Sequence, residues 1–415
     1  LVVGDKCGIL KNGLLLRFIY RSRKRKEAVR VNLKQLLEGI SYEVQQGTAD
    51  VEISDFQYDS RKEEKDGLFV CITGFQTDGH KYIPMALEKG AVALLCEHRV
   101  ENVPEGVTVL VTENNRIALA LLSDHFYGHP SAEMNVIGVT GTNGKTSTTY
   151  LMKSILDRIG KKVGIIGTIE NRIGDEVLKA ERTTPESKEL QALFRRMKNE
   201  DVTDVVMEVS SHSLDLHRVD GIAFDVAIFT NLTQDHLDYH KTFKAYIEAK
   251  KAFFDRLPAH AFALTNADDK NGLVMLQNTR AHRYTYSCRT MADFTAKAIE
   301  KHLDGTLLRL DGEEVWTKFT GDFNAYNLLA VYAAARLLGI TKENVLEYVS
   351  LLVPVSGRFE TLISTEGVMA VVDYAHTPDA VENVLSTICG LKGRDNQVIT
   401  VVGAGGDCDK TKRPE

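Results

Sequence analysis

One segment, VIGVTGTNGKTS at residues 136–147, reads as an apolar strand that turns through glycines into a helix beginning near Thr146. Successive backbone N–H groups in such a turn can surround a phosphate, and the helix N-terminus adds favourable partial charge. Lys145 would neutralise the β- and γ-phosphates, and the Thr146 hydroxyl would hold Mg²⁺. The GxxxxGK[ST] pattern is not matched, because Val139 occupies its first glycine position. A glycine turn without nucleotide is the alternative, but the flanking strand, the helix and the Lys-Thr pair favour an ATP site.

Apolar segments alternate with helical segments from Asn135 onward, as in a parallel sheet with crossover helices. The sequence predicts strands over residues 135–139, 162–166, 202–208, 226–229 and 261–264, and two later strands over 368–372 and 397–402. Upstream, strands over 67–72, 91–96 and 107–111 and a helix over 82–89 predict a smaller α/β module. The predicted fold class is therefore α/β, with the phosphate loop on a parallel central sheet.

Glycine and proline mark two boundaries, one near Gly128 and Pro130 and one within residues 353–357. We therefore expect domains over residues 31–130, 131–353 and 354–415. Only about sixty residues follow the second boundary, which is few for a complete α/β domain, so we expect the last domain to be truncated. Residues 1–30 run from an apolar stretch into a basic one, the reverse of a secretory signal. We expect them to be a disordered or spurious leader; the alternative is a basic arm that touches lipid or RNA.

The composition excludes several classes of protein. The chain has 415 residues, with 51 Lys and Arg against 57 Asp and Glu and a net charge of −6, which argues against nucleic acid as a partner. No apolar run is long enough to span a membrane, and we expect a cytoplasmic monomer. The six cysteines stand singly without metal-ligand spacing, so we expect neither disulfides nor structural zinc.

Polar residues gather after two of the predicted strands. Glu208 lies in MEVSSH at 207–212, and TNLTQDHLD at 230–238 follows the strand at 226–229. Ligands collect at the carboxyl ends of strands in open α/β sheets, where Glu208 would be a ligand for a hard cation. Each cluster alone also reads as a helix cap or a polar loop. The phosphate loop alone fits kinases and GTPases as well as ligases.

Together these motifs resemble those of the Mur ligase family, the ATP-dependent amide-forming enzymes of peptidoglycan precursor synthesis. The resemblance runs from about Asn32 to Pro414, with the motifs in the family's order. The motifs are TGTNGKT at 140–146, MEVSSHSLDLHRV at 207–219, TNLTQDHLDYH at 230–240, TNADD at 265–269, GDFNAYN at 321–327, SGRFE at 356–360, DYAHTPDA at 373–380 and GAGGDCDKTKRP at 403–414. The resemblance implies three domains: a small UDP-binding domain, a central ATPase domain and a Rossmann-like C-terminal domain.

The resemblance also implies roles for individual residues. Lys250 would be a carbamylated lysine that holds metal, although without the family it would be read as a solvated helix charge. The catalytic residues would be Lys145, Glu208, His236, Lys250 and Arg358. The ATP-binding residues would be Gly141, Thr142, Asn143, Gly144, Lys145, Thr146, Ser147, Asn266, Asn324, Asn327, Arg358 and Asp373. The metal ligands would be Thr146, Glu208, His236 and Lys250.

For the second substrate, the resemblance is greatest to the ligase that adds the third stem-peptide residue, diaminopimelate or L-lysine, to UDP-N-acetylmuramoyl-L-alanyl-D-glutamate. The residues TTPES at 183–187 carry part of this match. The matching positions for the uridine-diphosphate end are Ser60, Phe75, Gln76 and Thr77, and those for the muramoyl dipeptide are Thr183, Thr184, Ser210 and Arg218. Arg218 suits a carboxylate or a phosphate because its guanidinium can bind either with two hydrogen bonds.

The implied reaction is condensation through an acyl phosphate. Two positions depart from the family: Cys408 stands where arginine is expected to contact the incoming amino acid, and Arg182 stands where asparagine is usual. The segment that distinguishes diaminopimelate from lysine is not present before Glu415. We therefore expect nucleotide binding with weak condensation. The alternatives are another Mur-type or folylpolyglutamate-type ligase, and a non-catalytic nucleotide-binding fragment.

Overall fold

The computed structural model describes residues 30–62, 65–74, 77–233, 237–365, 368–393 and 396–403. These form two compact units. The first holds the described residues up to Glu133 together with 185–196 and 216–222, and the second holds 134–184, 197–215 and the residues from Ala223 onward. The expected leader up to residue 29, and also Phe75, Gln76, His236 and Cys408, lie outside the described residues.

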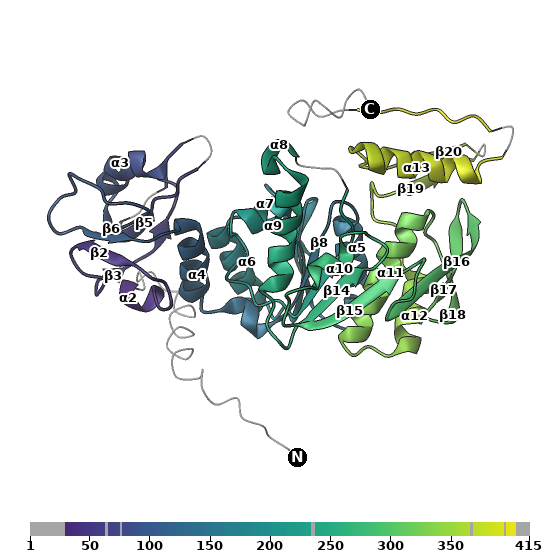
Figure 1. Cartoon of the computed structure of the whole chain (residues 1–415), viewed down its shortest axis with the longest axis horizontal. Helices are drawn as coiled ribbons and strands as arrows, with labels where there is room; N and C mark the ends of the chain where they lie inside the picture. Colours follow the sequence, from purple (N-terminus) through teal and green to yellow (C-terminus); the bar gives the residue numbers. More distant parts are fainter. Residues whose placement is uncertain are drawn as a thin grey trace, which may run out of the picture. The chain divides into compact units, whose positions relative to one another are not determined.

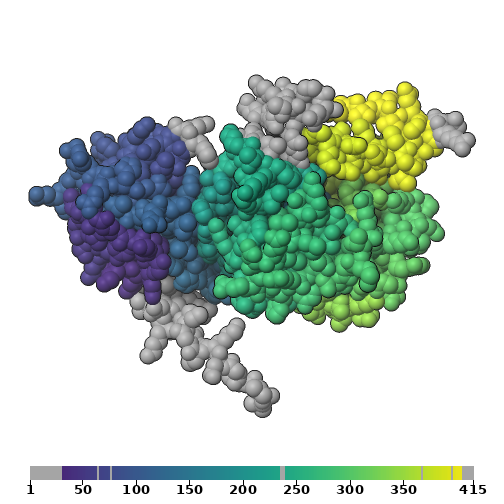
Figure 2. Space-filling view, viewed as in Figure 1, coloured from purple at the N-terminus to yellow at the C-terminus, as the bar shows by residue number. Residues whose placement is uncertain are grey.

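A five-stranded sheet organises the first unit, and the part of the chain that forms it is purple to blue in Figures 1 and 2. Its strand order is β2 (Glu43–Gln46), β7 (Thr108–Val111), β6 (Ala91–Cys96), β5 (Gly67–Val70) and β4 (Phe56–Gln57). β2 pairs antiparallel with β7, and the other neighbours are parallel. β1 (Val31–Asn32) and β3 (Glu52–Ile53) form a separate antiparallel pair. The helices are α2 (Leu33–Leu36), α3 (Ile83–Glu88) and α4 (Asn115–Tyr127), with short 3-10 turns η2 (Gly79–Tyr82) and η3 (Pro130–Glu133).

Both faces of this sheet are buried, because alternate side chains of a strand point to opposite faces. Leu68 and Val70 belong to an apolar cluster that includes residues of α2 and α4. Phe69 and Cys71 belong to a second cluster that includes Ile83 of α3. The predicted α/β module is thus a sheet between two helical layers.

An eleven-stranded sheet forms the second unit (Figure 1). Its strand order is β11 (Glu176–Lys179), β10 (Glu170–Ile173), β9 (Val163–Ile166), β12 (Asp204–Glu208), β8 (Asn135–Thr140), β13 (Val226–Phe229), β14 (Phe262–Asn266), β15 (His282–Ser287), β16 (Phe294–His302), β17 (Gly305–Leu310) and β18 (Glu313–Thr317). The neighbours from β9 to β16 pair in parallel. The five strands β9, β12, β8, β13 and β14 of this parallel part were predicted, whereas β15 and β16 were not. The strands at both edges are antiparallel hairpin strands that the periodicity did not predict.

Helices cover this sheet on both faces. Ile137 and Val139 of β8 pack in one cluster with residues of α5 (Lys145–Arg158) and α11 (Asp322–Leu337). Between them in sequence, Gly138 faces Phe253 of α9 (Phe243–Asp255), and a Cβ at Gly138 would lie 2.7 Å from that ring. The other helices of this unit are α7 (Ser211–Asp215), α8 (Leu237–His240), α10 (Gly272–Met275) and α12 (Lys342–Leu351). Most of α6 (Ser187–Asn199) belongs to the first unit, which holds residues 185–196.

The last part of the described chain contains β19 (Glu360–Ile363), β20 (Met369–Val372) and α13 (Pro378–Leu391). β20 coincides with the strand predicted over 368–372, but the strand predicted over 397–402 is wrong. Within the described residues 396–403 no strand forms, and the side chains of Ile399 and Val401 are 82% and 94% exposed. A strand needs a neighbour to accept its backbone hydrogen bonds, and in this part of the described chain β19 and β20 pair only with each other.

None of the helices in the described ranges is both long and apolar enough to cross a bilayer.

Candidate active site

The phosphate loop lies between β8 and α5, where two glycines let the chain turn. Gly141 has a φ of 151° and Gly144 a φ of 84°, in the region that favours glycine. A Cβ on Gly141 would lie 1.9 Å from Thr230 Oγ1, and one on Gly144 would lie 2.5 Å from Asn327 Oδ1. Glycine is therefore required at both positions by conformation and by close neighbours.

Residues that follow β13 hold this loop in place. The N–H of Thr142 donates to the carbonyl oxygen of Asn231 at 2.8 Å, and the N–H of Asn143 donates to Asn231 Oδ1 at 2.9 Å. The sequence predicted that successive N–H groups of this turn surround a phosphate. Two of these groups donate within the protein instead, so fewer of them are left to bind a phosphate. α5 begins at Lys145, one residue earlier than predicted, and Gly144 provides no side-chain cap. The first-turn N–H groups, which lack acceptors within a helix, are suited to an anion.

Three cationic side chains converge on the loop. Lys145 Nζ donates to the carbonyl oxygen of Gly141 at 2.9 Å. Lys250 Nζ donates to the same oxygen at 3.0 Å, and this lysine is only 1% exposed. Arg358 Nη2 donates to Thr146 Oγ1 at 3.1 Å. Three positive charges at a helix N-terminus make the site suitable for a polyanion such as a nucleoside triphosphate.

A buried carboxylate lies beside these cations. Glu208, at the end of β12, is 1% exposed, and both of its oxygens accept from the Thr146 hydroxyl at 3.1 Å. The N–H and hydroxyl of Thr168, which follows β9, also donate to Glu208, at 2.9 and 3.0 Å. A Cβ on Gly167 would lie 2.6 Å from Glu208 Oε1, so a glycine is needed for this approach. The carboxylate and hydroxyl oxygens form a donor set that a hard divalent cation prefers.

Lys250 reaches the loop from α9. Its ammonium lies 4.8 Å from the centre of the Tyr246 ring, and the Tyr246 hydroxyl is 3.0 Å from Thr142 Oγ1. Without the family, Lys250 would be interpreted as a solvated charge on a helix. That interpretation is wrong, because the side chain is buried against the phosphate loop. His236, the third residue of the expected metal group, lies outside the described residues.

Three asparagines expected near the nucleotide lie around the loop. Asn266 Nδ2 donates to the carbonyl oxygen of Thr230 at 2.9 Å. Asn324 and Asn327 are neighbours on α11, where Asn327 Nδ2 donates to Asn324 Oδ1 at 3.3 Å. Asn327 also borders Gly144. Ser147 is buried in the first turn of α5.

Arg358 and Asp373, both predicted to bind ATP, have different surroundings. The Arg358 guanidinium lies 4.9 Å from the centre of the Tyr374 ring while it donates to Thr146. Asp373 Oδ2 accepts from the N–H of Phe359 at 2.7 Å, and Phe359 has a φ of 50°. Asp373 therefore holds the turn that carries Arg358.

The residues expected to bind the second substrate fall in both units. In the second unit, the Thr184 hydroxyl donates to the carbonyl oxygen of Glu208 at 2.9 Å and to Ser210 Oγ at 3.4 Å. Thr183 Oγ1 lies 3.0 Å from Thr168 Oγ1, so these residues adjoin the buried carboxylate. The first unit contains buried Ser60, exposed Thr77, and Arg218 paired with Glu186 at 2.7 Å.

Several residues at the loop escaped the sequence analysis. Thr168 follows β9, and a stricter search of strand ends could have found it. Asn231 lies in the polar segment 230–238 that the sequence analysis noted, but no role was assigned to it. No pattern in the sequence around Tyr246 predicts its contact with the phosphate loop. Asp379, at the start of α13, accepts from Asn143 Nδ2 at 3.1 Å. Burial, followed by the nearby Glu382, raises the pKa of the Asp379 carboxyl.

Comparison with known proteins finds one family along the chain. Its profiles match as "Mur ligase family, catalytic domain" over 52–127, "Mur ligase middle domain" over 139–335 and "Mur ligase, glutamate ligase domain" over 357–415. A UDP-N-acetylmuramoyl-L-alanyl-D-glutamate–2,6-diaminopimelate ligase of Bacteroides fragilis is 49% identical over 384 residues, 92% of this chain and 79% of the relative. The ligase of the same name from Cytophaga hutchinsonii is 45% identical, with the same coverage. A solved structure of a ligase of this name has a TM-score of 0.75 and 28% identity, covering 93% of this chain and 79% of that one.

Proposed function

Because the chain belongs to the Mur ligase family and is an ATP-dependent amide ligase of peptidoglycan synthesis, we propose that its substrates are UDP-N-acetylmuramoyl-L-alanyl-D-glutamate and 2,6-diaminopimelate. The names of the relatives support this pair of substrates. L-lysine is the competing amino acid.

The observation that carries the proposal is the contact of Thr146 with buried Glu208 beside the phosphate loop. The nucleotide phosphates would lie at the start of α5, where Lys145 and Arg358 neutralise their charge. We propose that Asn266, Asn324 and Asn327 border the adenosine, because they surround the loop on its β13–β14 and α11 side.

Magnesium fits the same residues. Cis ligands of octahedral Mg²⁺, with bonds of about 2.0–2.1 Å, are about 2.9 Å apart. Thr146 Oγ1 and the Glu208 oxygens are 3.1 Å apart, so both can serve as ligands after a small adjustment. The ion would neutralise charge on the transferring phosphoryl group. His236 is a further proposed ligand.

Lys250 would hold a second ion only in a modified form. An ammonium repels a cation, whereas reaction of its neutral amine with CO₂ forms an N–C bond, releases a proton and leaves a carbamate with two oxygen donors. The burial of Lys250 against Gly141 supports a role at the phosphate loop rather than on the surface.

The chemistry begins when the D-glutamyl side-chain carboxylate attacks the γ-phosphorus of ATP. ADP leaves, and the incoming amine then displaces phosphate from the acyl phosphate, losing a proton as the amide bond forms. Two anions must meet in the first step, so the main contribution of Lys145 and Arg358 is electrostatic stabilisation. Thr183, Thr184 and Ser210, next to Glu208, would orient the carboxylate. Arg218 would bind a carboxylate of the dipeptide, and Ser60, Phe75, Gln76 and Thr77 would bind the uridine diphosphate.

The test supplies ATP and the muramoyl dipeptide with diaminopimelate, lysine or hydroxylamine as the acceptor. Hydroxylamine captures an acyl phosphate as a hydroxamate and does not require an intact amino-acid site. We expect ADP and hydroxamate to form only when the dipeptide is present, neither to form in Lys145→Ala, and diaminopimelate to be preferred over lysine. Tight binding of both substrates without ADP or hydroxamate would contradict the proposal and indicate a non-catalytic nucleotide-binding protein.

A further inference from the structure

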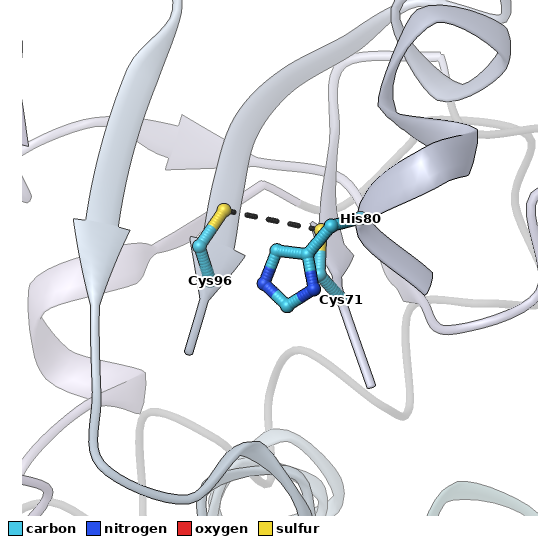
Figure 3. Close-up of side chains that lie close together, drawn as sticks. All are labelled: Cys71, His80 and Cys96. Carbon is cyan, nitrogen blue, oxygen red and sulfur yellow. Dashed lines mark hydrogen bonds between the residues drawn. The ribbon is translucent and has the colours of Figure 1, made fainter. Parts of the chain in front are cut away.

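Three side chains with metal-binding atoms meet inside the first unit, in a cluster separate from the phosphate loop. Cys71 directly follows β5, Cys96 ends β6, and His80 belongs to η2 (Figure 3). One ligand atom from each lies within 4.8 Å of the others. Both cysteines are 0% exposed and His80 is 9% exposed. The proposed ligase chemistry does not use these residues.

The fold accounts for this meeting. β5 and β6 are parallel neighbours, and the N–H of Cys71 donates to the carbonyl oxygen of Leu95 at 2.8 Å. The two thiols therefore lie side by side on the face that packs against α3. η2 approaches closely because Gly79 has no side chain, since a Cβ there would lie 2.7 Å from the backbone nitrogen of Ile72. Gly79 N–H also donates to the Ile72 carbonyl oxygen at 2.9 Å, which places His80 beside the thiols.

The sulfur positions suit a shared ion. Cys71 Sγ and Cys96 Sγ are 3.9 Å apart. Two thiolates on a tetrahedral zinc ion, with Zn–S bonds of about 2.3 Å, are about 3.8 Å apart. A disulfide needs a separation of about 2.05 Å, roughly half the distance found. The observed spacing of the two sulfurs therefore matches joint coordination of one ion.

The histidine has the outer contacts of a metal ligand. Its Nδ1 lies 2.6 Å from Asp78 Oδ1, so Nδ1–H donates to a carboxylate, as metal-binding histidines commonly do. This leaves the lone pair on Nε2, which accepts the N–H of Glu97 at 3.0 Å. An ion would take over that lone pair from Glu97.

We propose that Cys71, Cys96 and His80 form a binding site for a zinc-class divalent ion, with a solvent molecule or solute as the fourth ligand. Two sulfurs and an imidazole select a borderline-soft ion and disfavour Mg²⁺. Cys71 and His80 stand at the two ends of the segment 71–80, and Cys96 ends β6, so the ion joins that segment to β6. Its role is structural, because it holds the turn that carries Thr77 against the sheet.

The test measures zinc bound to the full chain after dialysis, by elemental analysis, in the unmodified protein and in Cys71→Ser, Cys96→Ser and His80→Gln. Cys389→Ser is the matched control, because Cys389 is exposed on α13. We expect one zinc per chain in the unmodified protein and in the control, and loss of that zinc in the three cluster variants. Cobalt in place of zinc in the unmodified protein should give sulfur-to-metal charge-transfer absorption. This second readout does not depend on the folding of any variant.

Removal of zinc by a chelator should lower the midpoint of thermal unfolding, and added zinc should restore it. Absence of zinc and of the cobalt spectrum in the unmodified protein would overturn the proposal. A mass two hydrogens lower, with a Cys71–Cys96 disulfide in the peptide map of the native protein, would overturn it in favour of a redox pair.

Discussion

Replacement of Glu208 by glutamine removes one negative charge from the phosphate-loop site and keeps nearly the same shape. Oε1 accepts from Thr168 N–H and Thr146, so the amide oxygen of glutamine can take its place. The amide nitrogen would then face two hydroxyls, which can rotate to accept. The backbone and the packing around residue 208 should therefore survive the substitution.

The expected effects on stability and on binding differ in size. Hydrogen bonds to charged groups contribute about 1.5–3 kcal/mol and neutral ones about 0.5–1.5 kcal/mol, so the free energy of unfolding should fall by about 1–2 kcal/mol. Loss of an outer contact to a metal ligand costs about 10–100-fold in metal affinity. Loss of a proposed direct ligand should cost at least as much, or about 1.4–2.8 kcal/mol in Mg²⁺-dependent nucleotide binding.

The assay is a calorimetric titration of ATP into the protein, with and without Mg²⁺, alongside thermal unfolding. Glu170→Gln is the matched control, because Glu170 is a partly buried carboxylate on β10 that contacts Tyr150 and Arg172 instead of the loop. Glu208→Gln should lose most of the gain in affinity that Mg²⁺ provides, whereas the control should keep it. Equal Mg²⁺ dependence in Glu208→Gln and the unmodified protein would refute the assignment of Glu208 as a ligand.

Three further predictions concern other residues. Gly141→Ala should weaken ATP binding at least tenfold, because its Cβ would lie 1.9 Å from Thr230 Oγ1 and the backbone strain is about 1–3 kcal/mol. Calorimetry should find no comparable loss in Gly390→Ala, where an added Cβ would meet no other part of the protein within 4 Å beyond its own helix. Arg358→Ala should slow ADP formation, and Arg358→Lys should restore part of the rate through its charge but not the stacking on Tyr374; equal rates in all three proteins would contradict the role. Burial, followed by nearby Asp268, raises the pKa of Cys288 from 9.0 to about 12, so stability should fall as pH rises from about 9 toward 12. At pH 8, iodoacetamide should label exposed Cys389 much faster than Cys288. Equal rates of labelling would contradict the raised pKa of Cys288.

The phosphate loop could be predicted because its chemistry is local. Gly141, Gly144 and Lys145 are close in sequence, and the turn geometry needs those residue types in that order. Short apolar runs bounded by polar residues or glycine were also predicted well, and 91–96 and 226–229 coincide with β6 and β13.

Features that depend on distant neighbours could not be predicted in the same way. The run 397–402 has the apolar pattern of a strand, but in the described chain it has no neighbour with which to pair. The burial of Lys250 follows from the position of α9 against the loop, which the sequence around Lys250 does not encode. Cys71, His80 and Cys96 lack any regular ligand spacing, so the sequence predicted no zinc site. Their approach arises only from the pairing of β5 with β6 and the close contact at Gly79.

The transfer of oxygen from the dipeptide to phosphate tests the central claim most directly. The D-glutamyl side-chain carboxylate is labelled with heavy oxygen, and the protein is supplied with ATP, Mg²⁺ and hydroxylamine. If that carboxylate takes the γ-phosphoryl group at the site formed by Lys145, Thr146 and Glu208, mass spectrometry will find one labelled oxygen in each released phosphate. Release of unlabelled phosphate at the same rate would mean that water attacks ATP, and would contradict the account.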